Sequence, residues 1–480
     1  MAYPRARYPP LPMAAPFTVL IMAAGQGTRM RSDVPKVLHR LAGKTLVQWV
    51  VDMARAAGAT RVVVVVRPGD GVVEGLPDGV EVAEQREGEG TGAAVLAARD
   101  AVLRAGGPAG GTGGGPVVVL SGDHPLVTAE QLRGLLAEHE KRAARATLLT
   151  TDQLDPAGYG RVVRDSNGDV DRVFETKYTE GLSKEELDAR EINAGTYVFE
   201  AHILFDALGK VALERDERYL TGVLPLIRED GGTIAAYLTD DGDAAIGVND
   251  RVGLFRAEQI AQRRLIEEHA RAGVTFLQPG TTRVEVGVTI GSETVIGPGT
   301  ALEGSTTIGE RCEVGPHTTV RDATIRDGAT VLQSFVLEAE IGPDANVGPF
   351  AYLRPGTIVR ANAKIGAFVE VKNSDIGEGA KVPHLSYIGD TDVGEQSNLG
   401  ASTITANYDG RKKHRTKLGK SVKTGVHTSL IAPLDVGDRA YTGAGSTITD
   451  DVPEGALGVA RERQKNIEGY ADRVEEDSQK

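Results

Sequence analysis

Residues 290–301 read Ile-Gly-Ser-Glu-Thr-Val-Ile-Gly-Pro-Gly-Thr-Ala, so that an aliphatic residue followed by glycine returns at every sixth position. The same interval runs from Val284 to Ile448, with a few steps of five residues and one interruption over Thr405–Lys417. A step of six fits neither the helical period of about 3.6 residues nor the two-residue alternation of a simple strand. It predicts a solenoid of short strands that turns a corner every six residues and points each aliphatic side chain inward. Chance richness in glycine and valine within a disordered segment would not keep this interval for so long.

The glycine after each aliphatic residue is the second feature of the repeat. We expect it to provide the backbone angles that a corner needs, because glycine adopts such angles without steric strain. The repeat resembles that of the hexapeptide-repeat acyltransferases. This resemblance implies a left-handed parallel β-helix, a homotrimer in which three such coils associate, and acyl-CoA sites between neighbouring chains.

The composition limits the kinds of protein that the chain can be. Its 480 residues are enough for more than one domain, and a net charge of −13 argues against a nucleic-acid surface. The one cysteine, Cys312, excludes an internal disulfide and fits a reducing cytoplasm. No apolar run is long enough for a transmembrane helix, so no membrane span is expected. Residues 1–16 contain five prolines and no apolar signal-peptide core, and we expect a disordered extension there.

A short apolar run near the start of the chain, Thr18–Met22, predicts a buried parallel strand. Residues 23–30, Ala-Ala-Gly-Gln-Gly-Thr-Arg-Met, follow it directly. A strand, a glycine-rich turn and a basic residue can together cradle a phosphate, because backbone N–H groups can approach the anion and Arg29 adds positive charge. The turn is not a dinucleotide-binding fingerprint, since Met30 stands where the third glycine would be. It is not a Walker A loop either, since no Gly-Lys-Ser/Thr closes it.

Pro35 and Lys36 follow this turn. Together with residues 22–30 they resemble the signature of the sugar-phosphate nucleotidylyltransferases, Leu-x-Ala-Gly-x-Gly-Thr-Arg-Met followed by Pro-Lys. The resemblance implies that Arg29 and Lys36 are catalytic and stabilise charge on the α-phosphate and on the leaving pyrophosphate. It also implies that the nucleotide is bound at Ala23, Ala24, Gly25 and Lys36.

Strand and helix signals alternate through the rest of this half. Leu46–Ala57 and Val95–Arg104 have helical patterns, whereas Val62–Val66 and Val117–Leu120 are apolar runs typical of strands. This order predicts an α/β, Rossmann-like domain with a mostly parallel sheet that binds ligands at the carboxyl ends of its strands. Asp123 stands just after one of these strands. An aspartate in such a place is often only a turn former, but this one is at the expected ligand edge.

The resemblance to the nucleotidylyltransferases also implies a metal site and a sugar-nucleotide site. Mg²⁺ is expected between Asp123 and Asn249, because a carboxylate and an amide oxygen, completed by water and phosphate, suit a hard cation. The residues that match the family's positions for UTP and UDP-N-acetylglucosamine are Gln85, Gly90, Thr91, Gly160, Glu175, Asn193 and Asn249.

A nucleotidylyltransferase half followed by a hexapeptide half resembles a family of bifunctional bacterial enzymes. In that family the β-helix acetylates glucosamine 1-phosphate with acetyl-CoA. The first domain then transfers uridylyl from UTP to make UDP-N-acetylglucosamine, a cell-wall precursor. The resemblance implies a uridylyltransferase domain over 17–249, a linking helix over 250–275, an acetyltransferase β-helix over 276–465 and a tail over 466–480.

The acetyl-transfer positions of this family are matched in the second half of the chain. His384 matches the general base that takes a proton from the attacking amine, a role that suits an imidazole. The sugar-phosphate positions include two cations, which suit a phosphate dianion. The matching residues are Arg354, Lys372, Tyr387 and Asn398 for the sugar phosphate, and Ala401, Asn407, Tyr408, Ala444 and Arg461 for acetyl-CoA.

The chain departs from the family at several positions. Val426 stands where a serine is usual beside the acetyl group, and a valine side chain cannot form the hydrogen bond of a hydroxyl. The loss of that hydrogen bond favours slower or altered acetyl transfer. The other departures are Arg67, Ala93, Ser121 and Gly222.

Three alternatives to the bifunctional enzyme stay open. The first is a uridylyltransferase whose β-helix is a scaffold without acetylating activity, which Val426 favours. The second is a nucleotidylyltransferase for another sugar phosphate, such as glucose 1-phosphate. The third is a regulatory subunit without catalytic activity, against which stand the four charged or polar residues Arg29, Lys36, Asp123 and Asn249.

Overall fold

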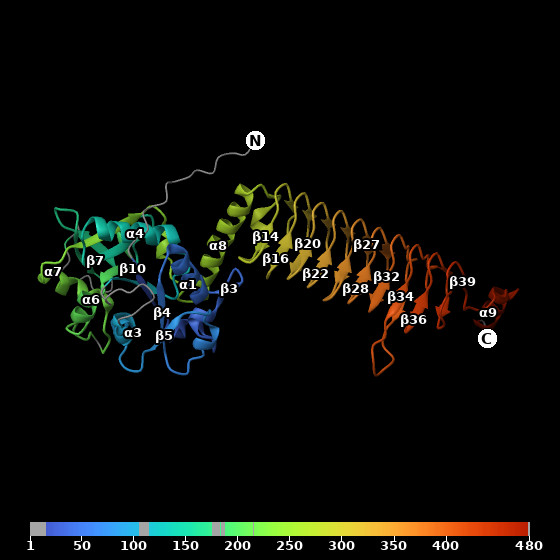
Figure 1. Ribbon diagram of the computed structural model, residues 1–480, viewed down its shortest axis with the longest axis horizontal. Helices are drawn as coiled ribbons and strands as arrows, with labels where there is room; N and C mark the ends of the chain where they lie inside the picture. Colours follow the sequence, from blue (N-terminus) through green and yellow to red (C-terminus); the bar gives the residue numbers. More distant parts are fainter. Residues whose placement is uncertain (1–15, 105–114, 175–182, 184–187, 215, 479–480) are drawn as a thin grey trace. The chain divides into compact units, whose positions relative to one another are not determined.

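The computed structural model describes residues 16–104, 115–174, 183, 188–214 and 216–478. The chain divides into two compact units, Met1–Ala261 and Gln262–Lys480. The first unit is an α/β domain and the second a coil of short strands (Figure 1). The extension expected over 1–16 lies outside the described residues, apart from Pro16.

One sheet organises the first unit. Its strands run parallel except β10, which is antiparallel to both of its neighbours in the main strand order, and a hairpin of β8 (Arg161–Arg164) and β9 (Val170–Phe174) pairs with β10. The predicted Rossmann-like α/β fold with a mostly parallel sheet is confirmed. In order across the sheet, the main strands are β11 (Ile234–Thr239), β7 (Ala146–Thr151), β10 (Ile192–Glu200), β6 (Pro116–Ser121), β1 (Thr18–Met22), β4 (Arg61–Val66) and β5 (Glu81–Glu84).

Helices cover both faces of this sheet. Successive side chains of the central strand point to opposite sides, and they are apolar on both sides, so each face has to be covered. Val19 and Ile21 enter the core on one side and Leu20 the core on the other. The first side is covered by α1 (Leu46–Ala57) and α4 (Ala129–Lys141). The second is covered by α2 (Thr91–Ala97), α3 (Arg99–Leu103), α6 (Ala201–Leu208) and α7 (Val223–Glu229).

The two helices predicted for this half have different outcomes. α1 has the predicted bounds: Thr45 caps its start by accepting a hydrogen bond from Gln48 N, and Gly58 follows its end with a φ of 102°. The single helix predicted over Val95–Arg104 is wrong. Two helices, α2 and α3, meet at Ala98, whose φ of −90° and ψ of 2° interrupt the α-helical backbone. Alanine is a good helix former, so the sequence carries no sign of this break.

α8 (Arg251–Arg271) leads from the first unit into the second; it begins one residue after the start of the linking helix expected over 250–275 and ends four residues before its end. It ends before Gly273, whose φ of 99° is typical of the left-handed residue that terminates a helix. Ile266 of this helix packs into the core of the coil. Among the described residues, no helix is both long and apolar enough to cross a bilayer.

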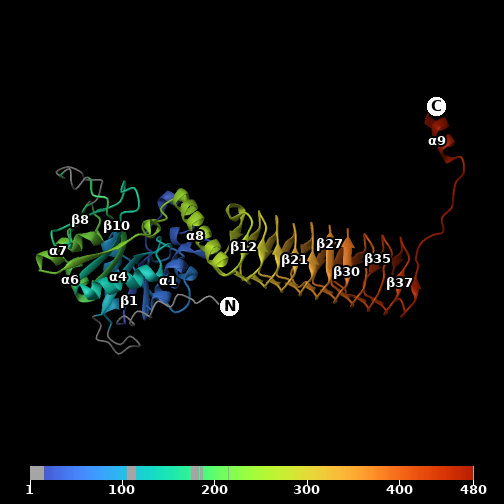
Figure 2. The ribbon, with the colours of Figure 1, turned by 90° about the horizontal axis from the view of Figure 1, so that it is seen from above.

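The second unit is the predicted left-handed parallel β-helix. Apart from the separate parallel pair β37 (Tyr441–Thr442) and β39 (Leu457–Gly458), its strands form three parallel sheets of seven, ten and nine strands, here named the first, second and third faces (Figure 2). The strands around the candidate site are β27 (Lys364–Ala367) and β30 (Lys381–His384) on the first face, β25 (Tyr352–Leu353), β28 (Glu370–Lys372), β31 (Tyr387–Gly389) and β33 (Ile404–Ala406) on the second, and β34 (Thr416–Leu418) on the third. A short helix, α9 (Tyr470–Ser478), follows the coil in the sequence.

The inward aliphatic residues form the core of the coil, as predicted. The aliphatic residues that recur at steps of five or six, from Ile296 to Leu399, are all buried, most of them completely. All of them belong to one continuous cluster. Burial of one such side chain stabilises a fold by about 1.5–3 kcal/mol. The cluster continues beyond the interruption through Leu418, Leu430, Val436 and Ile448.

The role predicted for the glycine beside the aliphatic residue is wrong in most coils. Left-handed backbone angles occur instead three residues after the aliphatic residue, as at Glu293, Asp344 and Asn362, where φ is 59°, 55° and 58°. Where the step is five residues, the left-handed residue comes two positions after, as at Gln333. The adjacent glycine is needed because the neighbouring coil leaves no room: a Cβ at Gly342 would lie 2.7–2.9 Å from backbone atoms of the next coil.

The interruption predicted over Thr405–Lys417 is too long at both ends. Thr405 is fully buried in β33, where it pairs with Leu430, and β34 already begins at Thr416. The Thr405 hydroxyl donates to Gly389 O at 3.1 Å inside the coil, so a threonine occupies an inward position that the aliphatic pattern does not mark. The segment that leaves the coil is therefore 407–415, which projects from it near β34 in Figure 1.

We expect Gly342→Ala to destabilise the coil, because the new methyl group would overlap the backbone of the next coil. Overpacking of this kind costs about 1–3 kcal/mol, which calorimetry would detect as a lower midpoint of coil unfolding. Asn362→Gly, at a left-handed corner, should move the midpoint little, since glycine adopts these angles freely. Equal effects of the two substitutions would contradict this account of the repeat.

Candidate active sites

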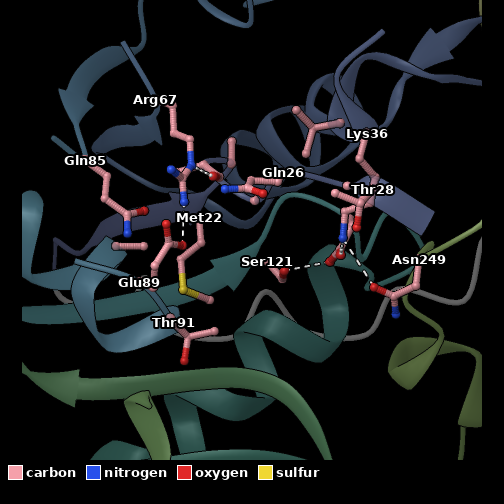
Figure 3. A pocket seen from close by; sticks show the side chains of 18 of the residues that line it. Met22, Gln26, Thr28, Lys36, Arg67, Gln85, Glu89, Thr91, Ser121 and Asn249 are labelled. Carbon is pink, nitrogen blue, oxygen red and sulfur yellow. Dashed lines mark hydrogen bonds and ion pairs between the residues drawn. The ribbon is translucent and has the colours of Figure 1, made fainter. Parts of the chain in front are cut away.

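A cavity of about 670 Å³ opens at the carboxyl ends of β1, β4, β5 and β6 (Figure 3). This is the edge at which a parallel α/β sheet binds ligands. The predicted residues that line the cavity are Ala23, Ala24, Gly25, Arg29, Lys36, Gln85, Gly90, Thr91, Asp123 and Asn249.

The glycine-rich turn after β1 forms one wall of the cavity. Gly27 has a φ of 61°, and a Cβ there would lie 2.7 Å from Lys36 Cβ. Only glycine therefore lets the lysine come so close to the turn. The turn and the lysine line the same cavity, which is an arrangement suited to phosphate groups.

Oxygen and nitrogen atoms from separate segments converge beside this turn. The Lys36 ammonium forms an ion pair with the Asp123 carboxylate and donates to Asn249 Oδ1 at 3.3 Å. Arg29 Nη2 donates to the same amide oxygen at 3.1 Å. Ser121 Oγ donates to Asp123 Oδ1 at 2.6 Å, so both carboxylate oxygens of Asp123 are engaged. Asp123 follows β6, and Asn249 stands just before α8.

Asp123 is held in its ionised form. Burial opposes ionisation, yet the pKa of Asp123 is lowered to about 2 because the ring of His124, the Lys36 ammonium and the Ser121 hydroxyl all favour the carboxylate. The carboxylate is the form that binds a cation, so no proton has to leave at neutral pH before a metal can bind.

The arrangement fits a divalent cation. Asp123 Oδ2 and Asn249 Oδ1 both face the Lys36 ammonium, so two oxygen atoms already converge on one positive charge. Mg²⁺ takes such carboxylate and amide oxygens and fills its other positions with water and substrate phosphates. In the described part of the chain, no group of three or more His, Cys, Asp or Glu side chains could hold a metal ion. A metal at Asp123 and Asn249 would therefore depend on oxygens of the substrate and of water.

Two of the described sugar-nucleotide residues, Gly160 and Asn193, do not line this cavity. Asn193 N donates to Gly160 O at 2.8 Å, so these two residues lie together, and the Asn193 amide donates to Tyr197 Oη at 2.6 Å. Glu175 lies outside the described residues. The lining residues that the sequence did not single out include Gln26, Thr28 and Glu89, of which the first two stand inside the glycine-rich motif and could have been found there.

In the β-helix, four predicted residues gather on the second face. Arg354 follows β25, Lys372 ends β28, Tyr387 begins β31 and Asn407 follows β33. A Cβ on Gly389 would stand 2.5 Å from Tyr387 Oη and 2.8 Å from Asn407 Nδ2. The absence of a side chain at Gly389 thus lets the phenol and the amide meet over the backbone.

Two residues that the sequence did not single out complete this group. Asp390 is buried and accepts hydrogen bonds from Asn373 Nδ2, at 2.5 Å, and from Asn407 Nδ2, so it orients the Asn407 amide. Lys413, from the loop that leaves the coil, lies beside Lys372, whose ammonium lowers the pKa of Lys413. Two neighbouring ammonium groups stabilise an anion such as a phosphate.

His384 stands in a column along the corner between the first and second faces. Backbone hydrogen bonds between successive coils place equivalent residues above one another at this corner, about 4.8 Å apart. The His384 side chain is exposed, and its ring forms no hydrogen bond with the described residues of this chain. The column contains His384, Ala401, Val426 and Ala444, and Arg461 lies beside Gly445 at its end.

Asn398 and Tyr408 stand apart from these groups. Asn398 pairs with Lys381 and Lys423 and is exposed on the first face, whereas Lys372 is on the second. Tyr408 is in the projecting loop and is 60% exposed. Within one chain, the structure therefore does not bring all the predicted acetyl-transfer residues together.

Two family models match the chain. Residues 19–176 match the MobA-like NTP transferase domain, and residues 287–322 match the bacterial transferase hexapeptide (six repeats). With the cavity of the first unit and the column of the second, these matches define a nucleotidyltransferase joined to a hexapeptide-repeat transferase.

Similar proteins share this arrangement over nearly their whole length. The bifunctional protein GlmU of Mycolicibacterium vanbaalenii is 46% identical over 465 residues, which cover 95% of this chain and 92% of that protein. GlmU of an Exiguobacterium species is 47% identical, covering 95% and 99%, and GlmU of Streptomyces avermitilis is 44% identical, covering 95% and 94%. The chain belongs to the bifunctional GlmU family. The prediction of one enzyme with a nucleotidyltransferase half followed by a hexapeptide acetyltransferase half is confirmed.

Proposed function

We propose that the coil transfers acetyl from acetyl-CoA to glucosamine 1-phosphate, and that the first unit then transfers uridylyl from UTP to the product with the help of Mg²⁺. The observation that carries this proposal is the convergence of Lys36, Asp123 and Asn249 beside a glycine-rich turn. These residues come from three separate segments and meet at an open cavity. A binding role accounts for this position, whereas a purely structural ion pair does not require a cavity. Membership of the GlmU family supports both steps.

In the proposed uridylyl transfer, the UTP phosphates lie against the glycine-rich turn. A phosphate oxygen of the sugar bonds to the α-phosphorus in line, as the bond from that phosphorus to pyrophosphate breaks. Lys36 and Arg29 offset the negative charge that grows on the α-phosphate and on the leaving pyrophosphate. Gln85, Gly90 and Thr91 bind the uridine, and the proposed sugar-binding residues are Gly160, Glu175 and Asn193.

Asp123 and Asn249 are the proposed ligands of Mg²⁺. When bound, this ion neutralises phosphate charge and orients the two reacting groups. Asp123 would supply a full negative charge and Asn249 a neutral oxygen. Ser121 holds one carboxylate oxygen of Asp123, and the other oxygen faces the Lys36 ammonium.

In the proposed acetyl transfer, Arg354, Lys372 and Lys413 bind the phosphate of the sugar. His384 takes a proton from the sugar amine as the amine nitrogen bonds to the thioester carbon, and the CoA thiolate then leaves. Acetyl-CoA lies along the corner column, where Ala401 and Ala444 leave space for it. Tyr387 and Asn398 are the further proposed contacts of the sugar phosphate, and Asn407, Tyr408 and Arg461 those of acetyl-CoA.

We also propose that three coils associate, because the acetyl-transfer residues occupy different faces of a single chain. A ladder of apolar side chains, Phe350, Phe368 and Leu385, follows the corner of His384 and is 53%, 60% and 57% exposed. The Phe350 and Phe368 rings stack with centroids 5.3 Å apart. An exposed apolar strip of this kind is typical of a surface that another chain covers.

We also propose that the enzyme acts in the cytoplasm, where both cosubstrates are made and a free Cys312 stays reduced.

Asp123→Ala should lower UTP turnover by two or more orders of magnitude, because it removes the charged metal ligand, while acetyl transfer stays unchanged. The measurement is pyrophosphate release at a series of Mg²⁺ concentrations, beside thiol release from acetyl-CoA. Asp100→Ala, which changes an exposed carboxylate on α3, is the matched control. Wild-type turnover by Asp123→Ala at ordinary Mg²⁺ would rule out the metal assignment.

His384→Ala should slow acetyl transfer by about 10²–10⁴-fold and leave uridylyl transfer intact, since a general base contributes a factor of this size. Thiol release from acetyl-CoA measures the effect. The matched control is His317→Ala, which removes another exposed histidine at a left-handed corner of the coil. Acetylation at the wild-type rate in His384→Ala would reject the assigned base.

Val426→Ser should increase acetyl transfer, because it restores a hydroxyl to the corner column. One hydrogen bond in the transition state is worth roughly 1–3 kcal/mol, or about one to two decades in rate. The same thiol assay measures this gain. If the wild-type protein shows no acetylation and Val426→Ser restores none, the coil is a scaffold and only the nucleotidyltransferase step remains.

Phe368→Asp should lower the mass that sedimentation of the full-length protein gives, from three times 50.7 kDa toward that of a single chain. It should abolish acetyl transfer, whose proposed site needs more than one chain, before it affects uridylyl transfer. The reason is that a carboxylate in the apolar ladder would lose its water on association. Phe255→Asp, an equally exposed phenylalanine on α8, is the control and should change neither property. A wild-type protein that acetylates as a monomer would contradict the trimer.

A further inference from the structure

One cationic side chain that lines the cavity of the first unit, that of Arg67, takes no part in the phosphate and metal chemistry proposed above. Arg67 follows β4 and lines the cavity. In Figure 3 it lies on the same side as Gln85 and Glu89, whereas Lys36 and Asn249 lie on the other. An arginine so far from the proposed metal ligands has no evident part in neutralising the reacting phosphate.

Two hydrogen-bonded contacts hold the Arg67 guanidinium in place. Its Nε donates to Ala24 O at 2.7 Å, and its Nη2 forms an ion pair with Glu89 at 2.6 Å. These contacts fix the plane of the group between the glycine-rich turn and the loop after β5. The third nitrogen, Nη1, donates to none of the residues that the structure describes, although the side chain is only 29% exposed. One N–H donor pair of known orientation thus remains for a ligand.

Gln85 lies next to Arg67 as a consequence of the sheet. Val66 pairs with Glu84 in register, so the two residues that follow them leave the sheet side by side. Gln85 is 5% exposed, and its Nε2 donates to Gly88 O at 2.9 Å. Its Oε1 accepts a hydrogen bond from none of the described residues. The pair therefore presents a guanidinium donor beside an amide oxygen acceptor.

A nucleoside triphosphate whose phosphates lie at Lys36 places its base at the Arg67 end of the cavity. Uracil carries a carbonyl at position 4 and an N–H at position 3, which complement a donor beside an acceptor. Cytosine carries an amino group and a bare ring nitrogen at these positions, so it would set donor against donor and acceptor against acceptor. Buried groups left unpaired in this way reject a ligand strongly.

We propose that Arg67 is a specificity-determining residue, which donates to the 4-carbonyl of uracil from a position fixed by Ala24 and Glu89 and so selects UTP over CTP. This inference rests on the proposed uridylyl transfer. A second role for the same contacts is a purely structural one, in which Arg67 only ties the glycine-rich turn to the loop of Glu89. The two roles differ in what they do to competing nucleotides, because a structural tie affects all of them alike.

The test is kcat/KM of the full-length protein for UTP and for CTP, with N-acetylglucosamine 1-phosphate as acceptor. Arg67→Met keeps the length of the side chain but has no donor. It should lower kcat/KM for UTP by about tenfold to a hundredfold through KM, with CTP nearly unchanged, so that the UTP/CTP ratio falls by that factor. Arg67→Lys, which keeps the charge and one donor group, should retain more of the ratio. Arg86→Met is the matched control: this arginine is 76% exposed, lies outside the cavity lining, and should leave both nucleotides unaffected.

An equal fall for UTP and CTP in Arg67→Met would overturn the inference and leave the structural tie. Glu89→Ala gives a second reading should Arg67→Met not fold, because it frees the guanidinium without removing it and should lower the same ratio by a smaller factor. An unchanged ratio in that variant would also overturn the inference. A wild-type protein that turns over no UTP would overturn the proposed function itself, whereas a UTP-specific wild type with an unaltered ratio in the variants removes only the role of Arg67.

Discussion

Close stacking of one coil on the next is the constraint on which the second unit depends. Adjacent strands of a sheet lie about 4.8 Å apart, so each six-residue unit has to fit against its own copies. The inward residues Leu353, Val371 and Ile388 are in register through three coils. Their outward neighbours are then in register as well, which brings the cations Arg354 and Lys372 to one strip of the second face. The candidate phosphate site is in this sense a consequence of how the core packs.

A parallel sheet imposes a corresponding constraint on the first unit. All strands that run in one direction end at one edge, so the segments that leave β1, β4, β5 and β6 have to share the space above it. This edge gathers the glycine-rich turn, Arg67, Gln85 and Asp123 around one cavity. The absence of a side chain at Gly27 lets Lys36 reach the same space, so that the proposed metal ligands and the proposed base-binding residues line one pocket.

Much of this arrangement could be predicted from the sequence, because it follows from short periods and from motifs in continuous segments. The inward residues of the coil, the bounds of α1 and the parallel sheet are of this kind. The break at Ala98 could not be predicted, since alanine favours a continuous helix. Asp390 and Lys413 could not be predicted for another reason. Each contacts a residue far from it in the sequence, and the repeat indicates which residues point inward but not which outward side chains meet. For the glycines of the repeat, the sequence predicts a role in corner angles, whereas the structure shows that the backbones of neighbouring coils leave no room for a side chain.

The central claim is that one chain carries out acetyl transfer and uridylyl transfer in that order. In the most direct measurement, the purified wild-type protein is mixed with glucosamine 1-phosphate, acetyl-CoA, UTP and Mg²⁺. Free thiol is followed with a colorimetric thiol reagent, and the phosphate compounds are followed by phosphorus NMR. Thiol should appear before pyrophosphate, the two should reach equal amounts, and UDP-N-acetylglucosamine should be the product. Without acetyl-CoA, the UTP should remain unused. Pyrophosphate released at the same rate from UTP and glucosamine 1-phosphate alone would contradict the account.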